Sequence, residues 1–282
     1  MDLERVQAFI SGKHEKLEGW FFPLDQIVFY ELVALQNRLG VIGDLCEIGV
    51  YQGKSLVFLS LLKSDGDRLF GFDLFEGDTQ AITETNLMNE GVAENVILTK
   101  GLTSDIPQAS LDALVNRPLK FLHIDAGHEY HEVLEQLSLF TPLLGDQGII
   151  AMDDYQDREF PGIEAAVLDF AEYDRPRRFL PFLAGGNKMF LCSAPLASAF
   201  QRNLINQPNF KDACRLTRIR DFNVLVLRSK LPVASEQIVN QIDSLHFPRR
   251  AETSLSLHQK AEMFSQLTFG SGRTSGAEQP PR

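Results

Sequence analysis

The sequence is poor in cysteine and has no long uninterrupted run of apolar residues. Its three cysteines, Cys46, Cys192 and Cys214, are an odd number at irregular spacing. Because two of them lie inside apolar runs, we expect reduced core thiols in a cytoplasmic protein, not a disulfide framework. No apolar run approaches the roughly 18 residues of a membrane span. No charged-then-apolar leader opens the chain, so neither a membrane span nor a signal peptide is expected.

Basic residues are scarce over most of the chain. The net charge is −11, and residues 1–200 carry 15 basic and 31 acidic side chains, a net charge of −16. Residues 201–282 carry 12 basic and 7 acidic side chains, a net charge of +5. An acidic main domain argues against broad binding to nucleic-acid phosphates. We expect the basic excess near the C-terminus to be solvated surface.

From residue 43 onward, short apolar runs alternate with segments of helical period. This alternation predicts βαβ units and a twisted parallel sheet with helices on both faces. Two further runs flank Ala184-Gly-Gly-Asn187 and predict a closing antiparallel hairpin. The predicted fold class is therefore α/β, a Rossmann-like, doubly wound, mostly parallel sheet of seven strands that ends in a hairpin. The predicted strands are residues 44–49, 68–73, 96–99, 119–124, 148–152, 178–183 and 188–193.

The chain divides into four predicted segments. The first is helical, with a 3.6-residue apolar period preceded by the aromatic cluster Trp20-Phe21-Phe22, and we expect it to form a lid or a dimerisation segment. The second holds the sheet, and the third is a C-terminal extension. The last has the composition of a disordered tail. The segments are residues 1–40, 41–195, 196–269 and 270–282.

Within the C-terminal extension the sequence signal is weak. The apolar run at residues 222–228 is compatible with one more strand, and residues 232–245 with a short helix.

A glycine turn follows the first predicted strand. It reads Glu47-Ile-Gly-Val-Tyr-Gln-Gly-Lys-Ser55, and its glycines at 49 and 53 allow a tight turn and the close approach of a ligand. The turn is not a P-loop, because three residues instead of four separate the glycines. It is not a dinucleotide fingerprint either, because position 51 is tyrosine. The second strand ends in Asp73, whose two oxygens suit a vicinal diol.

Acidic residues end the fourth and fifth predicted strands. Asp125 follows the fourth strand, and Asp153 and Asp154 follow the fifth. The carboxyl ends of parallel strands meet at one edge of the sheet, where ligands bind. Neighbouring carboxylates repel each other unless a cation compensates them, and Mg²⁺ prefers such oxygen ligands. We therefore predict a divalent-metal site at these three residues; the alternative is that Asp153 and Asp154 cap the loop or pair with Arg158.

A histidine lies close to the predicted metal site. His128 follows Asp125 by three residues, and an imidazole is suited to accept a proton near neutral pH. His123 lies inside the fourth strand on the face of Asp125, and His131 falls on the next helix. The spacing of Asp125, His128 and His131 also fits a zinc or iron site, and a purely structural His128 is a further alternative.

The glycine turn and Asp73 together resemble the first motifs of class I S-adenosylmethionine-dependent methyltransferases. In that family an acidic residue at the end of the second strand binds the ribose hydroxyls. The loop after the third strand surrounds the adenine. The resemblance implies that S-adenosylmethionine is the cofactor. The cofactor-binding residues that it implies are Glu47, Gly49, Gly53, Ser55, Asp73, Thr103 and Asp125.

A more specific resemblance covers residues 43–192. The sequences Ile124-Asp-Ala-Gly-His128 and Met152-Asp-Asp-Tyr155 resemble metal-dependent O-methyltransferases that modify sugars of macrolides and related natural products, of the macrocin and mycinamicin type. The resemblance implies that Asp125, Asp153 and Asp154 bind Mg²⁺ or another divalent cation. It also implies that His128, with Asp125, is catalytic. Ala126 departs from the family, which usually has glycine there.

The sequence thus predicts an S-adenosylmethionine-dependent O-methyltransferase that acts on a small hydroxylated acceptor, such as a natural-product sugar. We expect neither nucleic acid nor a membrane as a partner, and a homodimer through the aromatic N-terminal helices is compatible with the pattern. Two alternatives remain. One is a hydroxylase on the same scaffold, similar to cephalosporin hydroxylases, with iron in place of magnesium. The other is a non-catalytic S-adenosylmethionine-binding protein that interacts through its C-terminal extension.

Overall fold

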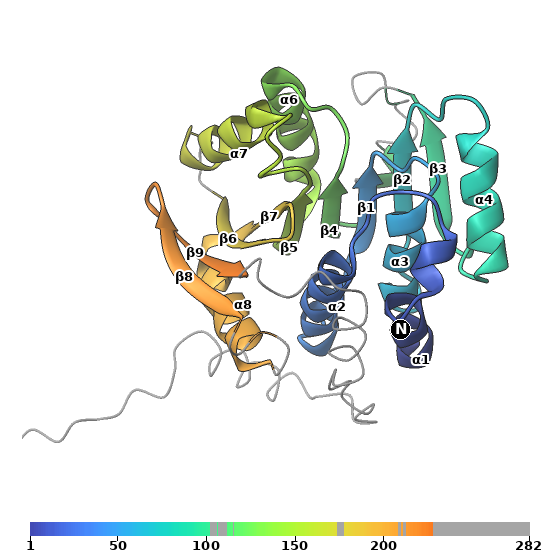
Figure 1. Cartoon of the computed structure of the whole chain (residues 1–282), viewed down its shortest axis with the longest axis horizontal. Helices are drawn as coiled ribbons and strands as arrows, with labels where there is room; N and C mark the ends of the chain where they lie inside the picture. Colours follow the sequence, from blue (N-terminus) through green and yellow to red (C-terminus); the bar gives the residue numbers. More distant parts are fainter. Residues whose placement is uncertain are drawn as a thin grey trace, which may run out of the picture.

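A nine-stranded sheet runs through the computed structural model of the chain (Figure 1). The structure describes residues 1–101, 106, 112–114, 116–173, 178–207, 210 and 213–227. Within them the strand order is β3-β2-β1-β4-β5-β7-β6-β9-β8. The strands are β1 (Asp44–Ile48), β2 (Leu69–Asp73), β3 (Val96–Lys100), β4 (Leu119–Ile124), β5 (Leu144–Met152), β6 (Phe179–Gly185), β7 (Lys188–Ser193), β8 (Cys214–Ile219) and β9 (Phe222–Leu227).

The sheet topology confirms the predicted α/β class. Strands β1 to β5 pair in parallel, and β7 pairs antiparallel with both β5 and β6, as the predicted hairpin requires. The chain order reverses between β1 and β4, because β2 and β3 lie on one side of β1 and β4 and β5 on the other. Such a reversal leaves a crevice at the carboxyl ends of the two central strands.

The predicted number of strands, seven, was too small. Strand β9, within the run at 222–228, pairs in parallel with β6, and β8 pairs antiparallel with β9. The hairpin-forming residues of the C-terminal extension thereby cover the edge that β6 would otherwise expose. The predicted helix at 232–245 and the predicted tail at 270–282 lie outside the described residues.

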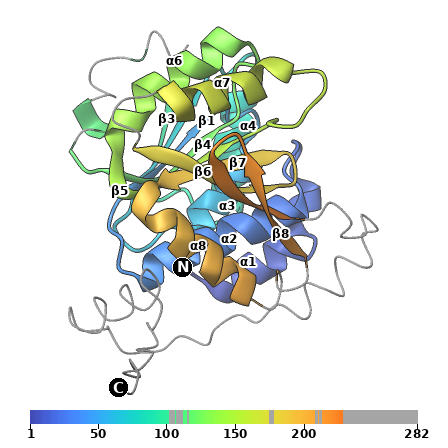
Figure 2. The same cartoon turned by 90° about the vertical axis from the view of Figure 1, so that its left-hand side faces the viewer.

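Helices cover both faces of the sheet (Figure 2). Along β4 the side chains alternate between the faces: Phe121 packs with the N-terminal helices and α8, whereas Leu122 and Ile124 pack with α6 and α7. Burial on both faces explains why the strand reads as a continuous apolar run. The helices are α1 (Leu3–Ile10), η1 (Lys13–Lys16), α2 (Pro23–Arg38), α3 (Lys54–Leu62), α4 (Thr79–Asn89), α6 (Tyr130–Phe140), η3 (Thr141–Leu143), α7 (Pro161–Tyr173) and α8 (Ala194–Asn206).

The N-terminal helices pack directly on the sheet domain. Phe21 is buried against Phe29 of α2 and Phe58 of α3, with ring centroids 5.1 and 5.7 Å away. Trp20 and Phe22, its neighbours in the aromatic cluster, are exposed. Phe21 therefore joins the N-terminal segment to the core, while the two flanking rings face outward. None of the described helices has the length and apolar character needed to cross a membrane.

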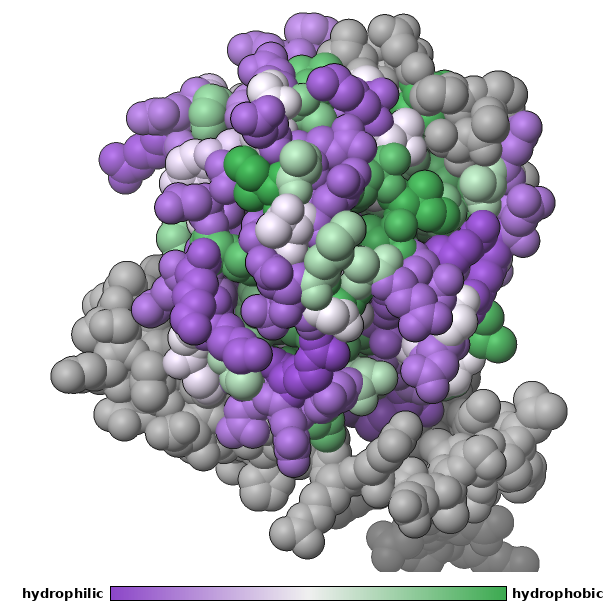
Figure 3. Space-filling model, turned by 90° about the vertical axis from the view of Figure 1, so that its right-hand side faces the viewer, coloured by the Kyte–Doolittle hydropathy of each residue, from purple (hydrophilic) through white to green (hydrophobic). Residues whose placement is uncertain are grey.

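Strand β3 forms the edge of the sheet opposite to β8. Ile97 on this strand and Met88 on α4 are exposed, on the side of the molecule where apolar side chains lie among polar ones (Figure 3).

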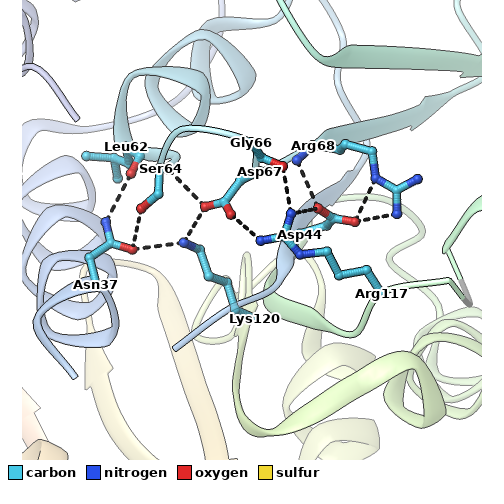
Figure 4. Close-up of polar contacts among 9 residues, drawn as sticks. All are labelled: Asn37, Asp44, Leu62, Ser64, Gly66, Asp67, Arg68, Arg117 and Lys120. Carbon is cyan, nitrogen blue, oxygen red and sulfur yellow. Dashed lines mark hydrogen bonds and ion pairs between the residues drawn. The ribbon is translucent and has the colours of Figure 1, made fainter. Parts of the chain in front are cut away.

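A buried polar network joins the amino ends of the central strands (Figure 4). Asp44, at the start of β1, accepts hydrogen bonds from Nε and Nη2 of Arg68 at 2.9 and 2.6 Å. Asp67 accepts from Nη2 of Arg117 at 2.7 Å and from Nζ of Lys120 at 2.5 Å. Lys120 is buried, and its ammonium group also donates to Asn37 on α2 at 2.8 Å. The network therefore fixes α2 and the sheet at the end opposite to the predicted ligand edge.

Replacing Asp67 tests the contribution of this network to stability. We expect Asp67→Asn to lower the free energy of unfolding by about 3 kcal/mol, because the Lys120 ammonium would be left buried without its carboxylate. Asp146→Asn is the matched control, since the Asp146 side chain is 97% exposed and lies 3.5 Å from Arg178. The control should change the free energy by less than about 0.5 kcal/mol. Equal urea-unfolding midpoints for the two variants would contradict this assignment.

Candidate functional site

The turn between β1 and α3 is packed so closely that two of its positions require glycine. Gly49 and Gly53 have φ values of +85° and +83°. A Cβ atom on Gly49 would lie 1.9 Å from the carbonyl oxygen of Asp125, and one on Gly53 would lie 2.8 Å from Cγ2 of Thr83. The turn therefore packs directly against the end of β4 at Gly49 and against α4 at Gly53, and only residues without a Cβ atom fit at these two positions.

Asp73 holds the glycine turn in place. Its Oδ2 atom accepts hydrogen bonds from the N–H groups of Val50 and Tyr51 at 2.7 and 2.9 Å, and its Oδ1 atom accepts from the N–H of Phe75 at 2.6 Å. Asp73 is partly exposed, and each carboxylate oxygen has more than one acceptor site. The same side chain thus holds the turn and keeps an acceptor site on Oδ1 for one hydroxyl of a ligand diol.

The other predicted cofactor-binding residues occupy different surroundings. Glu47 is buried on β1, and its Oε1 atom accepts a hydrogen bond from Nδ1 of His123 at 2.7 Å. Ser55 is buried at the start of α3. Thr103 lies outside the described residues. Glu47 on β1 therefore links this strand to the neighbouring strand β4 through a side-chain hydrogen bond.

An acidic and imidazole cluster forms where β4 and β5 end. Ligand atoms of His123, Asp125 and Asp153 all lie within 4.8 Å of one another. The backbone brings them together, because the N–H of Asp153 donates to the carbonyl of Ile124 at 2.9 Å. The structure thus brings Asp125 and Asp153 together and adds His123, which sequence reasoning placed on the same face without assigning it a role as a ligand.

Asp154, the third predicted metal ligand, points to different partners. It has a φ of +52°, and its Oδ1 atom accepts a hydrogen bond from Nδ2 of Asn187 at 2.9 Å. Its Oδ2 atom lies 3.4 Å from Nε2 of His128. His128 is exposed and stacks on Phe160 with ring centroids 3.9 Å apart. Asp154 is therefore a neighbour of the predicted base.

Sequence reasoning missed a buried lysine in this cluster. The ammonium group of Lys188, the first residue of β7, forms an ion pair with Oδ2 of Asp153 and lies 3.9 Å from Oδ2 of Asp25 on α2. All three side chains are buried. The available signal was a single lysine at the start of an otherwise apolar strand, directly after a hairpin turn. Lys188 and His123 therefore supply positive charge that the prediction assigned to a bound metal ion alone.

The buried charges shift one another's pKa values. Burial and the neighbouring Asp153 raise the pKa of Asp125 well above its ordinary value. Burial would also raise the pKa of Asp153, but Lys188 and His123 hold it below its ordinary range. Burial alone would lower the pKa of His123, but hydrogen bonds with Asp153 and Glu47 raise it to about 9. The cluster is consequently stabilised by opposite charges held in fixed positions.

Both groups implied by the sequence fit these residues. Once a divalent cation displaces their protons, Asp125 and His123 join the carboxylate of Asp153 as a set of donors that such a cation accepts. Around the glycine turn, the backbone at Gly49 and the carboxylate of Asp73 are partly exposed and can reach a ligand, whereas Gly53 is buried against Thr83. The two sites adjoin, because Gly49 touches the main chain of Asp125.

Residues 46–155 match the model of the family Methyltransf_24, described as a methyltransferase domain. No curated protein matches the chain. Among solved structures, the O-methyltransferase NovP is 18% identical, with a TM-score of 0.48 over 59% of this chain and 78% of that one. CalS11, a TDP-rhamnose 3'-O-methyltransferase, is 19% identical, with a TM-score of 0.46 over 59% and 79%. An O-methyltransferase from Bacillus cereus is 19% identical, with a TM-score of 0.46 over 67% and 88%.

Alanine at position 49 tests the contact between the turn and β4. We expect Gly49→Ala to destabilise the protein by about 1–3 kcal/mol more than Gly66→Ala, measured by urea unfolding. Gly66 has a similar φ of +80° but open space where its Cβ would lie, so its variant carries only the backbone strain, about 1–2 kcal/mol. If the two variants lose the same stability, the close packing at Gly49 is not real.

Proposed function

We propose that the chain contains a class I, S-adenosylmethionine-dependent methyltransferase domain, which the match of residues 46–155 to a methyltransferase-domain model supports, and that it transfers the methyl group to a hydroxyl group of a small molecule with the help of a divalent cation. The observation that carries this proposal is the contact between Gly49 and Asp125. It puts the glycine turn beside the acidic cluster, so that a methyl donor on the turn and a hydroxyl group at the cluster would be neighbours. Holding two reactants at such close range contributes on the order of 7–11 kcal/mol to catalysis.

On the donor side, the partly exposed backbone at Gly49 would approach S-adenosylmethionine, and the partly exposed carboxylate of Asp73 would accept a hydrogen bond from a ribose hydroxyl. Glu47 contributes indirectly, because it orients His123 through the 2.7 Å hydrogen bond. Ser55, at the start of α3, is buried below the turn.

On the acceptor side, Asp125 and Asp153 would hold the cation, and His123 is the third donor within reach. When bound, a divalent cation would supply positive charge that favours the deprotonated form of the acceptor hydroxyl. Lys188 keeps Asp153 ionised and fixed through its ion pair. Asp154, the residue after Asp153, also lies on the acceptor side, and a hydrogen bond from Asn187 orients its carboxylate.

His128 is the proposed proton acceptor. Its ring is exposed, so an acceptor hydroxyl can reach it, and stacking on Phe160 restricts the ring's orientation. After His128 has taken the proton, the carboxylate of Asp154 at 3.4 Å would stabilise the positive ring. We propose a natural-product sugar or a similar hydroxylated compound as the acceptor, on the basis of the motifs at 124–128 and 152–155.

Removing one carboxylate tests the role of the cation. We expect Asp125→Asn to weaken Mg²⁺ binding, measured by calorimetry, by about 100-fold or more, because an amide replaces a charged ligand. The Asp146→Asn variant, changed at an exposed position near the start of β5 and away from the cluster at its end, should bind Mg²⁺ like the unaltered protein. Methyl transfer that continues at the same rate in the presence of a chelator would disprove cation assistance.

Removing the imidazole tests the base. We expect His128→Ala to lower kcat by about 10²–10⁴-fold while leaving the Kd for S-adenosylmethionine unchanged. His131→Ala is the control, since His131 is exposed on the adjoining helix α6. The readout is a mass gain of one methyl group across a panel of hydroxylated acceptors. Oxygen consumption without methyl transfer would instead indicate a hydroxylase, and cofactor binding that Mg²⁺ does not affect would favour a non-catalytic protein.

A further inference from the structure

The only tryptophan of the chain lies beside the glycine turn. The indole ring of Trp20 packs on the ring of Tyr51, with centroids 5.8 Å apart and an interplanar angle of 32°. Tyr51 belongs to the turn itself, between Gly49 and Gly53. The two side chains are 76% and 44% exposed. The two rings thus form a solvent-exposed aromatic surface beside the glycine turn.

The chain holds Trp20 in this position from both sides. The carbonyl oxygen of Gly19 accepts a hydrogen bond at 2.9 Å from Nζ of Lys54, the first residue of α3. On the other side, Phe21 is buried in the core. The segment between η1 and α2 therefore passes the start of α3 and is hydrogen-bonded to it (Figure 1). Helix α3 is also the helix that follows the glycine turn. These two contacts hold the backbone on both sides of Trp20 and so fix the outward direction of its indole ring.

Trp20 belongs to the cofactor side of the site. The backbone N–H of Tyr51 donates to Asp73, the residue proposed to bind the ribose. The groups proposed to act on the acceptor have other neighbours, because His128 stacks on Phe160 and Asp154 accepts from Asn187. An aromatic ring at the turn can cover the apolar face of an adenosyl group and also attract a sulfonium charge.

We propose that Trp20 is a cofactor-binding residue, which together with Tyr51 forms the outer wall of the site and closes over S-adenosylmethionine on the glycine turn. This inference rests on the proposed function. It assigns a binding role to a residue that lies before the methyltransferase domain, in the N-terminal segment.

The fluorescence of the single tryptophan reports directly on this contact. We expect S-adenosylhomocysteine, which cannot react, to shift the emission to shorter wavelength or to quench it. The change should saturate with the same Kd that calorimetry gives. Calorimetric binding with unchanged emission would overturn the role of Trp20 and leave the proposed function intact. A failure of S-adenosylhomocysteine and S-adenosylmethionine to bind at all would overturn the proposed function and this inference with it.

Substitution at position 20 provides an independent test. We expect Trp20→Ala to raise the Kd for S-adenosylhomocysteine about tenfold, and Trp20→Phe to retain most of the affinity, because an aromatic face remains. Phe22→Ala is the matched control: Phe22 lies in the same segment and is 52% exposed, and it should bind like the unaltered protein. Because both side chains are exposed, circular-dichroism melting curves should stay unchanged. Equal Kd values for Trp20→Ala and Phe22→Ala would refute the proposal.

Discussion

The contact of Gly49 with the main chain of Asp125 is the constraint on which the site depends. It arises because β1 and β4 are parallel neighbours, with Ile48 opposite Ile124, while their connections leave the sheet in different directions. The residues that follow the two strands must therefore share one small space, and only a residue without a Cβ atom fits between them. The glycine turn and the acidic cluster become neighbours through this packing.

Charge compensation ties the acidic cluster to the rest of the fold. Asp153 faces Lys188 from β7 and His123 from β4, and Lys188 also faces Asp25 from α2. Buried ions are tolerated when they are paired, so each element must be in place before the cluster is stable. The hairpin β6–β7 contributes two neighbouring residues to the cluster. Asn187 donates a hydrogen bond to Asp154, and Lys188 forms an ion pair with Asp153.

The N-terminal segment serves both the core and the site. Helix α2 supplies Phe29, whose ring packs edge-on against His123 at 5.0 Å, and its first turn supplies Asp25. The residues before α2 carry Phe21 into the core and hold Trp20 beside the glycine turn. A segment outside the matched methyltransferase domain thus positions a charged group under the cluster and an aromatic group beside the turn.

Local patterns in the sequence were sufficient to determine the central strands, the hairpin, the tight turn at Gly49 and Gly53, and the meeting of Asp125 with Asp153. These features follow from periodicity, from turn chemistry and from the rule that parallel strands end at one edge. The tertiary structure alone decided that Lys188 lies against Asp153, that Asp154 turns towards His128, and that β8 and β9 extend the sheet. Contacts between side chains on elements far apart in the chain depend on packing, which leaves no periodic trace in the sequence.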